Sequence, residues 1–343
     1  MAYRYLRFAL TKGFGTPDDM EAALSAILSF ISIDIMHGSM TEFPLHHSAF
    51  RALQAQHQGK RESREGLAPD ETTFLAERFL NTIFYLQSTL SQSTNYDITP
   101  VPWSSDPQSS LIIQEFSYTI GPIDDHCLQY TYGTTKRLTM FIRAVTALFW
   151  SVAYYTSTGA YFPDTLQLEM DSLSKGLNDW RLESEDIIDL PDVASTRVVK
   201  LHILAFYNAI CIFRLTHLVL PLSTDDGTRS ALFHEVSFYV SEVLSHLRSI
   251  ERIKQQNPRA FDRKSASIMW PGFIAACEAP QQGREGWVEW WENMLAYRIG
   301  NIASLYETLR DVWDLRDRTQ DDSYLLPAWR RLLREKRMVI IAL

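Results

Sequence analysis

The chain has 343 residues, of which 46% are hydrophobic and 12% aromatic, enough to bury a large core in one domain or two. Its net charge of −8 argues against nucleic-acid binding, because that affinity comes mainly from lysine and arginine side chains that neutralise phosphates. The three cysteines, Cys127, Cys211 and Cys277, fit neither a disulfide framework nor a paired-cysteine metal site.

The cysteines and the N-terminus together predict an intracellular protein, either cytoplasmic or nuclear. Cys211 and Cys277 lie in apolar runs that are typical of buried free thiols, and such thiols suit a reducing compartment. The first fifteen residues contain basic side chains but lack the continuous apolar core of a signal peptide. No run of about 18 apolar residues is free of charge, so we expect no membrane span.

Apolar residues recur at spacings of three and four along the first half of the chain, which predicts helices. The predicted helices cover residues 2–12, 18–37, 42–55, 69–91 and 125–150. The stretches 56–70 and 92–108 are polar and contain glycine or proline, so we expect surface loops there, the first of them mobile. Trp103, in the second stretch, is more typical of a loop aromatic laid on the surface than of a plug in a cavity.

The second half of the chain is also predicted to be helical, over residues 163–180, 192–219, 228–254 and most of 269–313. The segment 192–219 is apolar nearly all round, so we expect it at the centre of the fold. No run rich in valine, isoleucine and threonine alternates with polar residues, so we predict no β-sheet. The predicted fold class is all-α, a single large helical domain of about ten to fourteen helices in antiparallel pairs.

The stretch 269–313 is the one around which we expect the other helices to pack. It contains five tryptophans, Trp270, Trp287, Trp290, Trp291 and Trp313. Each buried aromatic side chain removes roughly 150–250 Å² from water, so these residues need apolar helix faces as partners. Trp290 lies off the centre of the apolar stripe, so we expect it to face solvent or a second partner. Gly300 indicates either a close helix crossing or a break.

Catalytic and metal-binding motifs give no strong signal in this sequence. It contains no nucleophile elbow, dinucleotide-binding loop, P-loop or HExxH zinc motif. His46 and His47 are adjacent and point about 100° apart on a helix, so they do not share a metal. Residues 124–127, Asp-Asp-His-Cys, are more typical of an acidic helix start than of a metal site. We therefore expect no metal and no cofactor.

The positive functional signal is a set of large aromatic and polar side chains that could line an apolar pocket or simply fill a dense core. The candidate ligand-binding residues are Trp150, Tyr154, His202, Arg214, Trp270, Phe273 and Trp291. Arg214 needs a carboxylate partner if it is buried, and Glu278 is a candidate for that partner. The basic run at 329–337 is typical of a solvated helix face.

A family resemblance runs through the tryptophan-rich stretch. The residues that carry it are, in order, Trp270, Pro271, Phe273, Ile274, Ala275, Cys277, Glu278, Ala279, Trp290, Gly300, Asn301, Ile302, Trp313, Trp329, Leu332 and Leu333. This pattern resembles the C-terminal regulatory domain of fungal zinc-cluster transcription factors, in the branch of the arginine-metabolism and sterol-uptake regulators. The resemblance covers about residues 2–340 and rests on residue pattern and order.

The resemblance bears on two partners, DNA and a small-molecule ligand. In the family, a six-cysteine zinc cluster that binds DNA precedes this domain, whereas the first cysteine here is Cys127, so we expect no direct DNA contact through such a module. We expect either an excised domain or a natural stand-alone relative. Members similar to the sterol-uptake regulators bind an apolar small molecule in a helical pocket, which makes such a molecule the expected ligand here.

Two functions follow from these expectations. The first is a regulatory module that binds an apolar metabolite or a protein partner without catalysis. The alternative is a cofactor-independent cyclase or pericyclase of fungal secondary metabolism, similar to a Diels–Alderase, that holds a polyketide or terpenoid in a reactive conformation. A homodimer is also expected, because large helical domains with many aromatics often expose an apolar patch.

Overall fold

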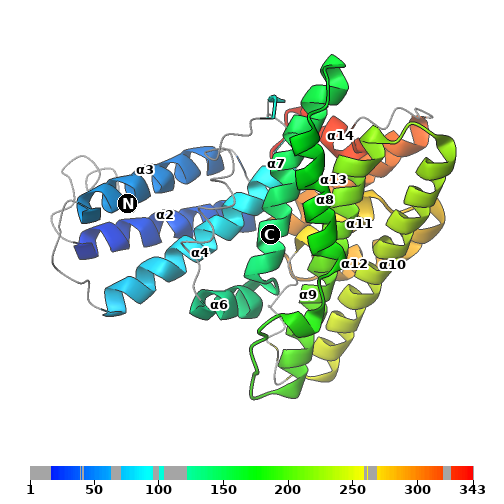
Figure 1. The fold of residues 1–343 in the computed structure, drawn as a ribbon. Helices are drawn as coiled ribbons and strands as arrows, with labels where there is room; N and C mark the ends of the chain where they lie inside the picture. The colour runs from blue at the N-terminus through cyan, green and yellow to red at the C-terminus, as the bar shows by residue number, and fades with distance from the viewer. Residues whose placement is uncertain are drawn as a thin grey trace.

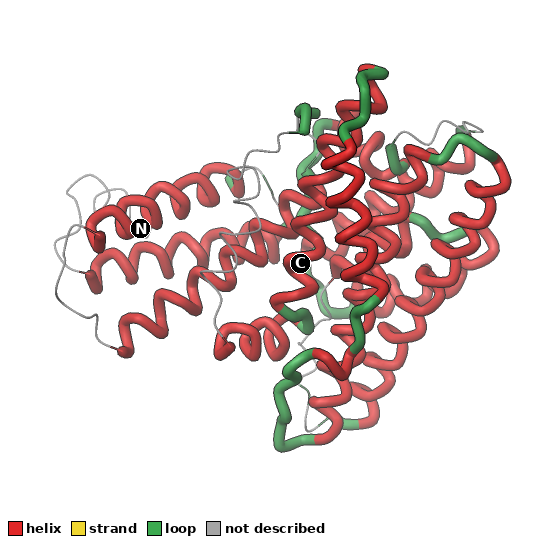
Figure 2. The backbone as a smooth tube through the Cα atoms, in the orientation of Figure 1, coloured by secondary structure: helices red, strands yellow, loops and turns green. Residues whose placement is uncertain are grey.

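The computed structural model describes residues 17–38, 40, 42–62, 71–95, 100–103, 122–258, 261, 269–319 and 326–342. Over these residues the regular secondary structure is helical and includes no β-strand, which confirms the predicted all-α class (Figure 2). The described part contains twelve α-helices, within the predicted number. The helix predicted at 2–12 lies outside the described residues.

Three helices form a layer at the N-terminal side of the molecule (Figure 1). They are α2 (Pro17–His37), α3 (Phe43–Glu62) and α4 (Glu71–Thr94). Helix α2 packs against both α3 and α4 through buried aliphatic side chains such as Leu24, Ile27 and Ile31. Helix α3 extends beyond the predicted 42–55, so residues 56–62 are helical and the loop predicted there is wrong in this part. The extension contains glutamine, lysine, arginine and glutamate, which favour helix strongly enough to carry one glycine.

The middle of the chain supplies the central helices. They are α6 (Pro122–Tyr132), α7 (Lys136–Thr158), α8 (Asp164–Asn178), α9 (Val193–Arg214) and α10 (Asp226–Gln256). Helix α7 begins where the Thr135 hydroxyl accepts a hydrogen bond from the Leu138 N–H, and it ends at Gly159 in the left-handed conformation. Helix α9 packs against α7, α10 and α11, as expected for the segment that is apolar nearly all round.

The C-terminal third contains four helices that pack on this centre. They are α11 (Met269–Cys277), α12 (Arg284–Leu295), α13 (Gly300–Arg318) and α14 (Ala328–Lys336). All five tryptophans of the 269–313 stretch are buried. Trp290, which we expected to face solvent or a second partner, is 2% exposed and covers Gly272 of α11. A side chain at Gly272 would collide with the Trp290 ring. The absence of a side chain at Gly272 therefore leaves room for the indole.

Two glycines lie where the N-terminal layer packs closely against the C-terminal third. Helix α13 begins at Gly300, and a Cβ atom there would lie 2.3 Å from the carbonyl oxygen of His37, at the end of α2. Gly38 follows with φ of 75° and faces the same turn of α13. Gly300 therefore marks both a helix break and a close crossing, the two alternatives that the sequence left open.

Three helical segments of the described chain are long and apolar enough to cross a membrane by length and composition alone: Asp19–His37, Lys136–Thr158 and Val193–Leu222. In the last of these, which contains α9, 78% of the apolar window is buried inside the fold. Packing against α7, α10 and α11 therefore accounts for its hydrophobicity, and the absence of a membrane span stays a prediction.

Candidate functional site

Arg330, the third residue of α14, is a buried cation in an aromatic environment. Its side chain is only 3% exposed. Its guanidinium carbon lies 4.5 Å from the ring centroids of both Phe149 and Trp329 and 5.4 Å from that of Trp150. These distances are within the range of cation–π attraction, which is strongest for desolvated pairs. The guanidinium therefore occupies the space between these three rings.

The hydrogen-bond partners of Arg330 are main-chain and imidazole acceptors. Its Nη1 donates to the Asn95 carbonyl at 2.9 Å and its Nη2 to the Ser93 carbonyl at 2.5 Å. Both carbonyls lie at the C-terminal end of α4, where the helix dipole is negative. No described carboxylate forms an ion pair with Arg330, so the end of α4 supplies the compensating partial charge. Burial lowers the pKa of Arg330 to about 9, and the side chain remains a cation at neutral pH.

His217 accepts the third hydrogen bond of Arg330, from Nε to Nε2 at 2.7 Å. Because Nε2 accepts, the neutral ring carries its proton on Nδ1, which lies 2.9 Å from the Phe213 carbonyl. Burial, together with the charge of Arg330, holds the pKa of His217 well below its usual value. His217 lies in a π-helical turn, η2 (Leu215–Val219), that follows α9, and such turns are frequent at functional sites.

Helix α11 joins the same cluster through its tryptophan and phenylalanine. The Trp270 Nε1 donates to the Ser93 hydroxyl at 2.9 Å, and its indole stacks on Phe206 of α9. Phe273, one turn later, meets the Trp329 ring edge to face. The end of α4, helices α9 and α11, and the start of α14 therefore converge around one polar centre, the Arg330 centre, composed of Arg330, His217 and the Ser93 and Asn95 carbonyls.

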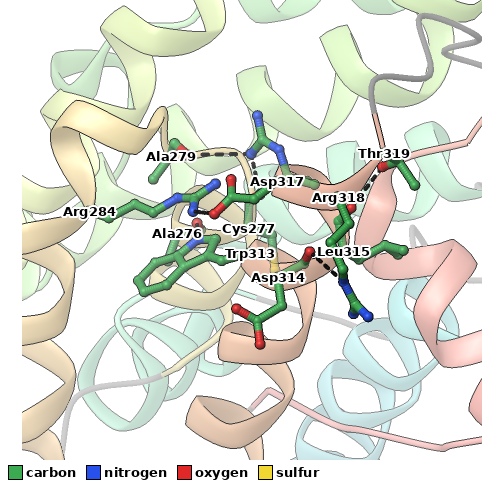
Figure 3. A network of polar contacts seen from close by, with 11 residues as sticks. Ala276, Cys277, Ala279, Arg284, Trp313, Asp314, Leu315, Asp317, Arg318 and Thr319 are labelled. Carbon is green, nitrogen blue, oxygen red and sulfur yellow. Dashed lines mark hydrogen bonds and ion pairs between the residues drawn. The ribbon is translucent and has the colours of Figure 1, made fainter.

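The C-terminal end of α11 is capped in a similar way by α13 (Figure 3). Trp313 Nε1 donates to the Ala276 carbonyl at 2.8 Å, and Arg316 Nη1 donates to the Cys277 carbonyl at 2.6 Å. Arg316 also lies 3.8 Å from the buried carboxylate of Glu278. Cationic side chains at these positions satisfy the last carbonyls of a helix and match its dipole. Arginine side chains thus bind the carbonyls at the ends of both α4 and α11.

A pocket of about 270 Å³ lies between α13 and the C-terminal strap, residues 338–341. Its lining consists of Gly38, Met40, Asn301, Ser304, Glu307, Thr308, Asp311, Lys336, Met338, Val339 and Ile340. The strap is held by two buried hydrogen bonds: the Thr94 hydroxyl donates to the Ile340 carbonyl at 2.7 Å, and the Asn301 amide to the Ile341 carbonyl at 2.9 Å. Thr94 is the last residue of α4, next to the carbonyls that bind Arg330.

Comparison with known protein families decides what kind of domain this is. The model of the fungal specific transcription factor domain matches residues 1–341. This chain belongs to that family. It is also 23% identical over 197 residues to arginine metabolism regulation protein II of Saccharomyces cerevisiae, a match that covers 56% of this chain and 21% of that protein. The match thus spans about a fifth of that relative's length. No solved structure matches this chain.

In this fungal transcription factor domain, three of the seven candidate ligand-binding residues meet at the Arg330 centre. Trp150 flanks the guanidinium, Trp270 binds Ser93, and Phe273 contacts Trp329. Each of the three contacts Arg330, Ser93 or Trp329, none of which was among the predicted candidates. Their role in binding a ligand stays a prediction.

The other four candidates lie at separate places in the family fold. Tyr154 meets Tyr155, and Trp291 stacks on Tyr306. His202 packs against Gly133, and its burial lowers its pKa to about 3. Arg214 donates to the Ser174 hydroxyl at 3.1 Å. The expected pair of Arg214 with Glu278 is wrong, because Glu278 lies beside Arg316.

Arg330 is the functional candidate that sequence reasoning missed. We expected the basic run at 329–337 to be a solvated face, and this is wrong for Arg330, although Arg334, Glu335, Lys336 and Arg337 are exposed. A signal was present: Arg330 precedes the buried Leu333 by three residues, which places both on one side of the helix. The prediction of a solvated face followed the charge of the run and not this periodicity.

The acidic run at 124–127 has a local structural role. Asp125 lies in α6 and accepts a hydrogen bond at 2.6 Å from the backbone N–H of Lys136, the first residue of α7. The carboxylate thus satisfies a free N–H at a helix start, as the sequence pattern suggested, although the helix start belongs to the next helix. No group of three or more metal-type ligands occurs within the described residues.

Proposed function

We propose that this domain is the regulatory module of a fungal transcriptional regulator and that a small molecule bound in the pocket beside the strap controls the position of α14. One observation carries this proposal. The segment 328–341 contains both the buried Arg330 and the strap that forms a wall of the pocket. A ligand that favours one position of the strap would therefore also favour one state of the Arg330 centre.

In this proposal the domain acts through a ligand or a protein partner and makes no direct contact with DNA. The net charge of −8 supports this, since an excess of negative charge disfavours the approach of phosphates. The exposed basic residues at the end of α14, such as Arg334 and Arg337, lie on the proposed moving segment and would give an acidic protein partner a surface to contact. Family membership supports a nuclear or cytoplasmic location.

The cyclase alternative gains no support from the aromatic cluster. A cyclase of this kind would need an apolar chamber that holds a flexible substrate. The space between Phe149, Trp150 and Trp329 is instead occupied by the Arg330 guanidinium. We therefore retain the regulatory function alone.

Thermal unfolding of the whole chain with a library of sterols, terpenoids, polyketides and small polar metabolites tests the proposal. A ligand should raise the melting temperature saturably, with about 2.7 kcal/mol of stabilisation at one hundred times its Kd. Hydrogen exchange should slow in segment 328–341. Val339→Trp, which fills the pocket, should abolish both effects, whereas Val101→Trp, at a half-exposed valine elsewhere, should preserve them. If no library member stabilises the wild type, the proposal is wrong.

A further inference from the structure

One wall of the pocket presents hydrogen-bond acceptors to any ligand. Ser304, Glu307, Thr308 and Asp311 lie along one side of α13. The Ser304 hydroxyl donates to the Gly300 carbonyl at 3.3 Å, and the Thr308 hydroxyl donates to the Ser304 carbonyl at 2.8 Å. A hydroxyl has a single hydrogen, so both oxygens can only accept further hydrogen bonds. Carboxylates are also acceptors only, so this wall is complementary to a donor.

The charge of the pocket is negative. Asp311 forms an ion pair with Lys336 at 2.5 Å, which neutralises one carboxylate. Glu307 is exposed and forms no ion pair or hydrogen bond with the described residues, so its carboxylate remains available. The pocket thus contains two carboxylates and one ammonium group, in a protein with a net charge of −8. Both the local and the overall field favour a cation over an anion.

The apolar residues and the size of the pocket limit the rest of the ligand. Met40, Met338 and Ile340 also line the pocket, and methionine side chains adapt to irregular apolar shapes. The volume of the pocket is about 270 Å³. It is below the roughly 300–1,000 Å³ of pockets that hold drug-sized molecules.

We propose that this pocket binds a small primary amine with a short alkyl body. The ammonium group donates to the Glu307 carboxylate and to the hydroxyl oxygens of Ser304 and Thr308, and the alkyl body lies against the methionines. This inference rests on the proposed function, because it names the ligand class of the same pocket. It also replaces the expected apolar small molecule by a charged one at this site.

Isothermal titration of the whole chain with n-hexylamine at pH 7.5 tests the ligand class. Three probes of similar length separate the contributions: 1-hexanol lacks the charge, hexyltrimethylammonium lacks N–H donors, and hexanoate has the opposite charge. We expect saturable binding of n-hexylamine only. Glu307→Gln should weaken this binding about tenfold, as expected for the loss of a charge-assisted hydrogen bond. The matched control Asp314→Asn removes a charge from an exposed position of the same helix and should leave the affinity unchanged.

Equal binding of n-hexylamine and hexyltrimethylammonium, or an unchanged affinity in Glu307→Gln, would overturn the inference. If n-hexylamine does not bind while a library molecule stabilises the wild type but not Val339→Trp, the ligand class is wrong and the proposed function stands. If neither n-hexylamine nor any library molecule binds, both fall. Glu307 is exposed, so its substitution leaves the folded core intact and the comparison remains valid.

Discussion

Arg330 brings a positive charge into the core, where three acceptors and the surrounding aromatic rings take the place of water. The Ser93 and Asn95 carbonyls and His217 Nε2 all depend on this one guanidinium. A buried acceptor that loses its donor costs about 1–3 kcal/mol, so the residue matters through the partners that it satisfies. This also explains how a cation without a carboxylate partner among the described residues is retained in the core.

Arg330→Ala should therefore lower the free energy of unfolding by about 3 kcal/mol or more, because it leaves three acceptors unsatisfied and a cavity between the rings. Urea unfolding followed by tryptophan fluorescence measures this. The control Arg334→Ala, at an exposed position of the same helix, should change stability by less than about 0.5 kcal/mol. Similar small effects for both variants would contradict the role given to Arg330.

The stability of the domain should also fall as the pH drops below about 6.5, the ordinary pKa of histidine. His217 is neutral in the folded state because its pKa is held well below that value, whereas the unfolded chain takes up a proton there. The unfolded state thus binds more protons in acid, which amounts to about 2 kcal/mol lost at pH 5 from this residue. Burial lowers the pKa of His202 to about 3, which adds a contribution of the same sign.

Urea unfolding at pH 7.5 and pH 5 measures this loss. His217→Gln should be less stable at pH 7.5 but should lose about 2 kcal/mol less than the wild type between the two pH values. His37→Gln, at an exposed histidine, should show the wild-type difference. An unchanged pH dependence in His217→Gln would show that His217 is not buried as a neutral ring.

Among the elements, the end of α2 and the start of α13 meet backbone to backbone at Gly300. This contact joins the N-terminal layer to the helix that lines the pocket. A Cβ atom at Gly300 would lie 2.3 Å from the His37 carbonyl oxygen, and backbone on both sides cannot move as a side chain would. The crossing therefore depends on the absence of a side chain.

Gly300→Ala should destabilise the domain by about 1–3 kcal/mol, the usual cost of overpacking, despite the better helix propensity of alanine. Thermal or urea unfolding provides the measurement. Gly283→Ala is the matched control, because a Cβ atom there would meet its nearest neighbour at an ordinary 3.6 Å. A neutral or stabilising effect of Gly300→Ala would mean that α2 and α13 are free to separate.

On the scale of the whole molecule, the N-terminal layer exposes several large apolar side chains. Ile33 and Met36 of α2 are each 55% exposed, and Leu45 of α3 is 60% exposed. Exposed apolar side chains in one region are typical of interaction surfaces. They support the expectation of a homodimer.

Light scattering at micromolar concentration should give a mass near twice the 39.6 kDa of one chain. Ile33→Lys with Met36→Lys should shift the mass to that of the monomer. Leu168→Lys, at an exposed leucine of α8, is the control and should leave the dimer intact. A wild-type mass near 39.6 kDa would rule out the homodimer at that concentration.

The sequence by itself determined the helical class, the central place of α9 and the family, because apolar periodicity and the order of the tryptophans are local signals that packing follows. These features depend on residues within a few turns of each other.

Only the tertiary structure decided which polar residues enter the core and where the pocket lies. Arg330 is buried because the end of α4, more than 230 residues earlier, supplies carbonyls that match its charge. Glu278 pairs with Arg316 and not with Arg214 because α11 ends against α13. The pocket likewise needs α2, α13 and the strap together. Such partners are distant in sequence, and no periodicity within one helix indicates them.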